Sequence, residues 1–315
     1  MDPIIPHAIA EKKGKSTPPS KAAFQADRKL VLEAVRRFKS NRDVVKAAVE
    51  KLGTALEYTS DTLKSDQEVV RSAVQQRGWA LQFASSELRG NHSIVMDAVK
   101  EDGMALYYAG ATIHDDRAIV LEAIKRSGGK ALRRASDSLR GDRELVLEAI
   151  EQGGGMLLQF ASAGPKDDRT VVMKAIQQKA AALEFASDGL KGDPELVLEA
   201  AKQDFLSFQF ASEQLRRDRA FVIEVVEANG EALQFASAAL RGDRGVVSAA
   251  ANQSWRAMRY ASPALRSDRE ILIQQTEEQL TTVAQKSAVA LSPLREISSL
   301  GNVEEEESKE EESPL

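Results

Sequence analysis

One interval recurs along this chain: an aspartate or asparagine opens a similar run of residues every 25 or 26 positions. A repeat of this length is one small structural unit that cannot bury its apolar face alone, so neighbouring copies must stack on one another. The period therefore constrains the fold more than any other feature. The opening residues are Asn41, Asp66, Asn91, Asp116, Asp142, Asp168, Asp193, Asp218, Asp243 and Asp268.

The first half of each repeat has the pattern of an amphipathic helix. In the repeat that opens at Asp218, the residues Val222, Val225 and Val226 lie on one face of a 3.6-residue period. The opening carboxylate can accept hydrogen bonds from the first backbone N–H groups, and Pro194 directly follows one such position, where proline is favoured. The expected structural caps are Asp66, Asp116, Asp142, Asp168, Asp193, Asp218, Asp243 and Asp268.

The second half predicts a shorter helix of about two turns. Leu233 and Ala236 share its inner side, and Ser237 is expected to cap one further turn that carries Leu240. Glycine near the junction is expected to end the first helix as a left-handed cap. These glycines are Gly53, Gly78, Gly103, Gly153 and Gly230.

The expected fold is all-α: an α-solenoid of about nine two-helix repeats of 25 or 26 residues. Aromatic residues make up only 5% of the chain, which favours closely packed helices over a β-sandwich. We expect a flexible leader over residues 1–25 and the helical repeat array over 26–285. Half-repeats that open at Asp27 and Asp268 would cap the array. Residues 286–315 are expected to be a linker and a disordered acidic tail.

The shared pattern reads Asp-Arg-Glu-x-Val-x-x-Ala-Ile/Val, followed by Gly-x-Ala-Leu-x-Phe/Tyr-Ala-Ser-x-x-Leu. It resembles the tandem helical repeat family known as domain of unknown function 4116, over roughly residues 27 to 280. The resemblance implies helical repeats and brings no catalytic residues. Three neighbouring repeats depart from the pattern: Gly110 replaces a serine, Arg134 an aromatic residue and Pro165 a leucine.

The residues that usually carry enzyme chemistry are few. The chain has no cysteine, which excludes disulfides, thiol catalysis and zinc–thiolate sites. Its histidines, His7, His92 and His114, show no metal-ligand spacing, and the glycines at 153–155 lack the context of a phosphate loop. We therefore expect no enzyme activity and no cofactor, metal or small-molecule ligand.

Charge is concentrated at the two ends of the chain. Residues 296–315 carry a net charge of −7 and residues 1–25 carry +2, which leaves the repeat body neutral. A neutral body speaks against nucleic-acid binding, because that binding is largely electrostatic. No apolar run is long enough to span a membrane and no secretory signal is apparent, so we expect a cytoplasmic protein. The lysine-rich stretch from residue 12 to 21 leaves organelle targeting as an alternative.

An arginine follows the opening residue in most repeats, although a cation there opposes the helix dipole. Two explanations remain open: each arginine pairs with an aspartate of the neighbouring repeat, or the arginines form a basic stripe that contacts an acidic partner. The arginines are Arg42, Arg117, Arg143, Arg169, Arg219, Arg244 and Arg269.

The recurring Phe or Tyr of the second half is expected to fill the core rather than to stack on bases. Arg134 occupies this aromatic position, so either the position is an exposed edge or Arg134 has an acidic partner, with Asp137 as one candidate. In the first case Lys130, Arg133 and Arg134 form a small basic patch. The candidate partner-binding residues are Lys130, Arg133, Arg134, Arg143, Arg169, Arg219 and Arg244.

The pattern favours a non-enzymatic protein–protein interaction scaffold, since helical arrays present long surfaces to partners. The first alternative is a nucleic-acid-binding repeat array, and the second is an enzyme with an unrecognised site. The acidic tail is expected to aid solubility or, alternatively, to contact a basic partner. The two Arg-Gly-Asp sequences, at 140–142 and 241–243, are expected to be turns that lead into the next helix cap.

Overall fold

A computed structural model describes residues 21–268, and all regular secondary structure within this range is helical. The expected cap helix after Asp268, the acidic tail, Arg269 and most of the expected leader lie outside the described residues. The first described helix, α2 (Lys21–Arg37), begins earlier than the sequence suggested. Asp27 consequently lies inside α2 instead of preceding it.

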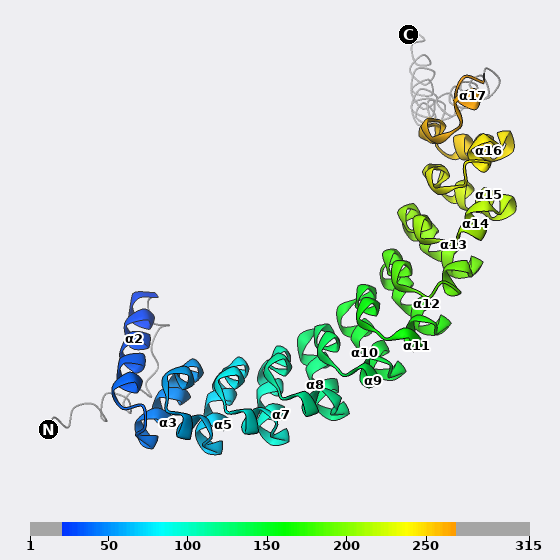
Figure 1. The fold of residues 1–315 in the computed structure, drawn as a ribbon. Helices are drawn as coiled ribbons and strands as arrows, with labels where there is room; N and C mark the ends of the chain where they lie inside the picture. Colours follow the sequence, from blue (N-terminus) through cyan, green and yellow to red (C-terminus); the bar gives the residue numbers. More distant parts are fainter. Residues whose placement is uncertain (1–20, 269–315) are drawn as a thin grey trace, which may run out of the picture. The chain divides into compact units, whose positions relative to one another are not determined.

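One order of elements recurs after α2 (Figure 1): an α-helix of ten or eleven residues, a short 3-10 helix and a brief helical turn. The first elements are α3 (Arg42–Lys51), α5 (Gln67–Gln76), α7 (His92–Glu101), α8 (Arg117–Ser127), α10 (Arg143–Gly153), α12 (Arg169–Gln178), α13 (Pro194–Gln203), α15 (Arg219–Ala228) and α16 (Arg244–Gln253).

These helices begin where the sequence predicted. The Asp66 carboxylate accepts hydrogen bonds from the backbone N–H groups of Glu68 and Val69, both at 3.0 Å. Equivalent caps precede the other helices, including those that open with asparagine. Each helix from α5 onward buries the same four positions of its inner face, which in α5 are Val69, Val70, Ala73 and Val74, while α3 buries three of them.

The second element is a 3-10 helix of five or six residues, so the predicted short helix of about two turns is confirmed, with 3-10 geometry. With three residues per turn, residues at i, i+3 and i+6 share one side, and Gly230, Leu233 and Ala236 are buried at this spacing. These elements are η1 (Gly53–Tyr58), η2 (Gly78–Phe83), η3 (Gly103–Tyr108), η5 (Lys130–Arg134), η6 (Gly155–Phe160), η7 (Ala180–Phe185), η9 (Phe205–Phe210), η10 (Gly230–Phe235) and η12 (Trp255–Tyr260).

The prediction of left-handed glycine caps was wrong at all five positions, because none of the predicted glycines has a positive φ angle: Gly53, Gly78, Gly103, Gly153 and Gly230. The residue that ends α5 is extended, with φ −156° at Arg77, and Gly78 after it has no positive φ. Gly78 is needed for space: a Cβ there would lie 2.4 Å from the carbonyl oxygen of Ala98 in the next repeat. Among the described residues, positive φ occurs at Gly128, Gly129 and Gly154, all in the repeats of 26 residues.

The third element is the turn that the sequence predicted. The hydroxyl of Ser237 accepts a hydrogen bond from the N–H of Leu240, at 3.4 Å, and the N–H of Ser237 donates to the carbonyl of Arg216 in the preceding repeat. The turns are α4 (Asp61–Lys64), α6 (Ser86–Arg89), η4 (Ala111–Asp115), α9 (Asp137–Arg140), α11 (Ala163–Lys166), η8 (Leu190–Gly192), α14 (Glu213–Arg217), η11 (Leu240–Gly242) and α17 (Pro263–Arg266).

The chain divides into two compact units, residues 1–211 and 212–315. In the first unit α3 packs against α5, α5 against α7, α7 against α8 and so on to α13, and the 3-10 helices pack against one another in the same order (Figure 1). In the second unit α15 packs against α16 and η10 against η12. Within each unit the core is therefore continuous from one repeat to the next.

We predict that Gly78→Ala destabilises the protein by roughly 1–3 kcal/mol, because the added methyl group overpacks the contact with α7. Gly189→Ala is the matched control. Gly189 has helical φ and ψ angles, and its nearest neighbour would lie 3.7 Å from a new Cβ, so this change is expected to be neutral or slightly stabilising. Urea denaturation measures both variants, and equal stability of the two would contradict the steric explanation.

Candidate functional site

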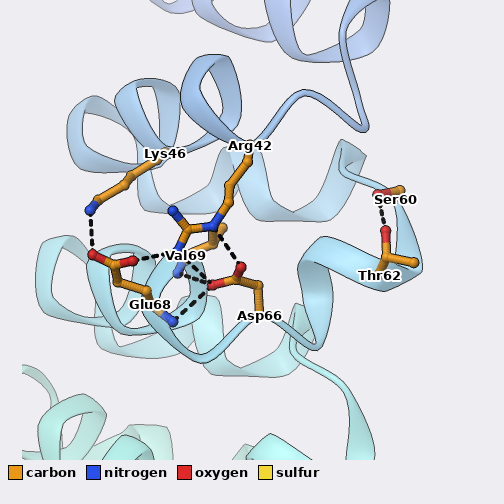
Figure 2. A network of polar contacts seen from close by, with 7 residues as sticks. All are labelled: Arg42, Lys46, Ser60, Thr62, Asp66, Glu68 and Val69. Carbon is orange, nitrogen blue, oxygen red and sulfur yellow. Dashed lines mark hydrogen bonds and ion pairs between the residues drawn. The ribbon is translucent and has the colours of Figure 1, made fainter.

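A ladder of ion pairs joins successive repeats. The guanidinium of Arg42, at the start of α3, lies 2.8 Å from the carboxylate of Asp66, which caps α5 (Figure 2). The same contact recurs in Arg117–Asp142 at 3.0 Å, Arg143–Asp168 at 2.9 Å, Arg169–Asp193 at 2.9 Å, Arg219–Asp243 at 3.0 Å and Arg244–Asp268 at 3.5 Å. The first of the two explanations for the recurring arginines is thus the one that the geometry supports.

From Asp66 to Asp243 the ladder aspartates use Oδ1 as the helix cap and Oδ2 for the shortest contact with the arginine, although in Asp66 and Asp243 the arginine also reaches Oδ1, at 3.5 and 3.3 Å. In Asp66, Oδ1 accepts from the N–H groups of its own helix, and Oδ2 accepts from Arg42. A second acid strengthens some of the pairs: Glu68 accepts from both Arg42 and Lys46 (Figure 2), and Arg117 lies 2.6 Å from Glu144. A cation in the first helical turn is therefore neutralised by the neighbouring repeat.

The arginines keep the ladder carboxylates ionised. The hydrogen bond from Arg42 lowers the pKa of Asp66, and that from Arg219 lowers the pKa of Asp243. At Asp142, burial alone would raise the pKa, but hydrogen bonds from a backbone N–H and from Arg117 outweigh it, so the pKa is lowered. The direction is the same at Asp168 and Asp193.

Two of the three repeats without an arginine at this position are consistent with the ladder, whereas the third has Pro194, which cannot form an ion pair with the aspartate of the next repeat. In the repeat before Asn91, Gln67 replaces the arginine. The residue at the arginine position is therefore uncharged, and so is the cap of the next repeat. His92 takes the position in the next repeat, and its Nε2 lies 3.2 Å from the carboxylate of Asp116. This matching of Gln67 with Asn91 is a signal in the sequence that favours pairing over a free basic stripe.

Of the predicted partner-binding residues, Arg143, Arg169, Arg219 and Arg244 all belong to the ladder. Their side chains are about half exposed, between 48% and 55%, but each already lies against a carboxylate of the next repeat. The structure therefore gives these four arginines a role in stacking.

Lys130, Arg133 and Arg134 lie together on η5, and the two arginines differ from the ladder residues because each lies over an aromatic ring. The guanidinium carbon of Arg134 lies 3.1 Å from the ring centre of Tyr107, and that of Arg133 lies 5.9 Å from the ring centre of Phe160. Lys130 and Arg133 are exposed and Arg134 is half-buried. We call Tyr107, Lys130, Arg133, Arg134 and Phe160 the aromatic–cation patch.

The position that Arg134 shares with the recurring aromatics is half-buried, so the prediction that these rings fill the core was wrong. The proposed partner Asp137 pairs with Arg140 instead. An edge position explains how an arginine fits there without a carboxylate. The half-buried rings are Tyr58, Phe83, Tyr108, Phe160, Phe185, Phe210, Phe235 and Tyr260.

A second basic position, which was not predicted from the sequence, lies two residues before each opening residue from Asp66 onward. The Nζ of Lys166 donates to the carbonyl of Gln159 at 3.0 Å, and His114 Nε2 lies 3.0 Å from the carbonyl of Leu106, so these side chains cap the end of their own 3-10 helix. Burial, with smaller contributions from nearby cations, lowers the pKa of Lys166. The basic residues are Lys64, Arg89, His114, Arg140, Lys166, Lys191, Arg216, Arg241 and Arg266.

In the part of the chain that the structure describes, no helix is long and apolar enough to cross a membrane. No group of three or more His, Asp or Glu residues there is arranged to hold a metal ion. The distinctive surface groups are thus those of the ladder, the second basic position and the aromatic–cation patch.

The repeat has a known family counterpart. The model of the domain of unknown function DUF4116 matches residues 41–89, 66–114, 91–130, 116–163, 168–216 and 218–266. The chain belongs to this family. Several matches overlap by one repeat, so one DUF4116 domain corresponds to about two repeats. No curated protein and no solved structure matches the chain.

The DUF4116 match that begins at residue 91 is shorter than the others and ends at Lys130. It stops three residues before Arg133, whereas the match over residues 116–163 includes both Arg133 and Arg134.

We predict that Asp66→Ala costs about 1 kcal/mol of stability from the lost helix cap alone. Asp66→Asn keeps a capping oxygen, as Asn41 and Asn91 do, and removes only the charge that Arg42 contacts. It should therefore be the milder change. Thermal and urea denaturation of both variants measure the difference. If Asp66→Asn is as damaging as Asp66→Ala, the division of tasks between the two oxygens is incorrect.

Acid should weaken the ladder. Because the folded pKa of Asp66, Asp142 and Asp168 lies below the unfolded value of about 3.9, their stabilising contribution is present above that pH and is lost as pH falls further. Unfolding free energy measured between pH 6 and pH 2.5 should fall less steeply in a triple variant with asparagine at positions 66, 142 and 168. Parallel pH profiles for the variant and the natural protein would rule the ladder out as the cause.

Proposed function

We propose that the chain is a non-enzymatic protein-interaction scaffold whose repeats stack as an α-solenoid. One observation carries the proposal: buried positions stay nearly constant between repeats, whereas the adjacent outward position varies in chemistry. From η1 to η7 a fully buried leucine recurs at one position of the 3-10 helix: Leu56, Leu81, Leu106, Leu132, Leu158 and Leu183. The residues that directly follow them are Glu57, Gln82, Tyr107, Arg133, Gln159 and Glu184.

This outward row contains acids, amides, an aromatic residue and a cation, one per repeat. Gln82 is half-buried, and the other five are exposed. Since each side chain sits at the same point of its 3-10 helix, the row repeats in position while it changes in charge. Such a row suits recognition of an extended partner, which contacts several repeats at once.

The contacts between repeats support the solenoid. Ladder pairs join residues that are 24 or 25 positions apart, and the N–H of Gly78 donates to Glu101, 23 positions away. In a solenoid each repeat contacts only its neighbours, so stability is a sum of local terms. A compact globular fold would instead be stabilised by contacts across many repeats.

Hydrogen exchange tests the solenoid. Gly78→Ala should speed amide exchange in the repeats around residues 53–103 and leave residues 218–266 at the exchange rates of the natural protein. Gly189→Ala serves as the control for handling effects. Uniform loss of protection along the whole chain would show one cooperative fold and contradict the solenoid.

Affinity capture tests the scaffold. A variant with serine at positions 82, 133, 159 and 184 removes part of the outward row and leaves the buried leucines and the ladder intact. We expect an unchanged melting temperature and the loss of partners that the natural chain captures and cross-links from native lysate. The proposal is wrong if no protein is recovered above background, or if every partner is retained by the serine variant.

A further inference from the structure

We infer that the aromatic–cation patch binds an acidic segment of a protein partner through paired carboxylates. This inference rests on the proposed scaffold function and names one site on it together with the chemistry of its ligand. The patch brings three cations together within five residues of η5 and places two aromatic rings beside them.

The positive charge of the patch is not compensated within the described part of the chain. None of Lys130, Arg133 and Arg134 forms an ion pair there, unlike the ladder arginines. The one nearby acid on the following turn, Asp137, is engaged by Arg140. The flanking repeats add no acid at the equivalent outward positions. These positions hold Met104, Tyr107, Tyr108 and Ala111 on one side and Met156, Gln159, Phe160 and Ala163 on the other.

The aromatic rings favour arginine as the recognition group. A guanidinium that stacks on a ring keeps its edge N–H groups available, and that edge matches the two oxygens of a carboxylate. Arg134 lies over Tyr107, which is 44% exposed and makes an edge contact with Tyr108 at 5.9 Å between ring centres. The ring thus holds a cation at the surface without neutralising it.

The Nε of Arg134 is buried and has no hydrogen-bond partner, and such a group destabilises the folded state. This feature is shared by four arginines of the second basic position: Arg89, Arg140, Arg216 and Arg241. What distinguishes Arg134 is therefore its place on the 3-10 helix. The other repeats place Phe or Tyr at this position, where an apolar ring needs no partner. A ligand that compensates the guanidinium would explain why an arginine is found here.

A protein ligand fits this patch better than a nucleic acid. Nucleic-acid binding depends on many phosphate contacts along a strand, whereas the cations here are confined to one repeat. The ladder arginines on either side, Arg117 and Arg143, are already paired with carboxylates. A short run of Asp or Glu matches three closely spaced cations.

Arg259 provides a matched control. It holds the same place in its repeat as Arg133, directly after the buried inner residue of η12, and its guanidinium carbon lies 4.6 Å from the ring centre of Tyr260. Unlike Arg133, Arg259 has an acidic partner, with Glu231 at 3.1 Å. Its charge is therefore already compensated within the protein.

The experiment measures binding of a fluorescent twelve-residue peptide of alternating Glu and Gly to the full chain by anisotropy. We expect at least tenfold weaker binding for Arg133→Gln combined with Arg134→Gln, unchanged binding for Arg259→Gln, and weaker binding at higher salt. Arg134→Phe restores the residue typical of the other repeats. It should fold at least as stably as the natural chain and still lose affinity, which separates binding from folding.

Three results would overturn the inference: equal binding of a peptide with Gln in place of Glu, equal loss with Arg259→Gln, or tighter binding of a single-stranded oligonucleotide of the same charge. Absence of binding to the natural chain at low salt would do so as well. None of these results alters the affinity-capture test of the outward row. The assignment of the patch can thus fail while the scaffold stands.

Discussion

The close stacking of neighbouring repeats is the constraint on which the rest of the structure depends. Each buried valine or leucine contributes about 1.5–3 kcal/mol, whereas exposed ion pairs contribute little. Small residues allow this stacking: the Cα of Gly78 sits where a side chain would strike the backbone of α7. Burial therefore holds the repeats together, and the Arg–Asp ladder sets how they align.

Much of this arrangement could be predicted from the sequence, because cap and helix positions follow local rules. Asp66 and Pro194 mark helix starts through hydrogen bonding and backbone geometry that depend only on nearby residues. The 3-10 helix could not be predicted as readily, since a spacing of i, i+3 fits both helix types. The role of Gly78 was also hidden, because it depends on the backbone of another repeat and not on its own φ angle.

For the candidate site, too, part of the arrangement could be predicted from the sequence and part could not. The sequence indicated that Arg134 was out of place and left open whether it had an acidic partner. Only the structure shows that Asp137 is taken by Arg140 and that Tyr107, from the preceding repeat, lies under the guanidinium. Likewise, the structure distinguishes arginines that look alike in sequence. Arg143 is paired with the carboxylate of Asp168, whereas Arg133 forms no ion pair within the described residues.

The left-handed glycines have a consequence for how such an array can change in length. Gly128 and Gly154 lie at the junction between the α-helix and the 3-10 helix in the repeats of 26 residues. The additional residue of these repeats is accommodated there, and the ion pair between neighbouring repeats still forms. Arg117 and Asp142 are 25 positions apart in the sequence, instead of the 24 that separate the pair in shorter repeats. Insertions at this junction are thus tolerated without loss of alignment, so this gene family has a place where its repeats can diverge in length while the stack is preserved.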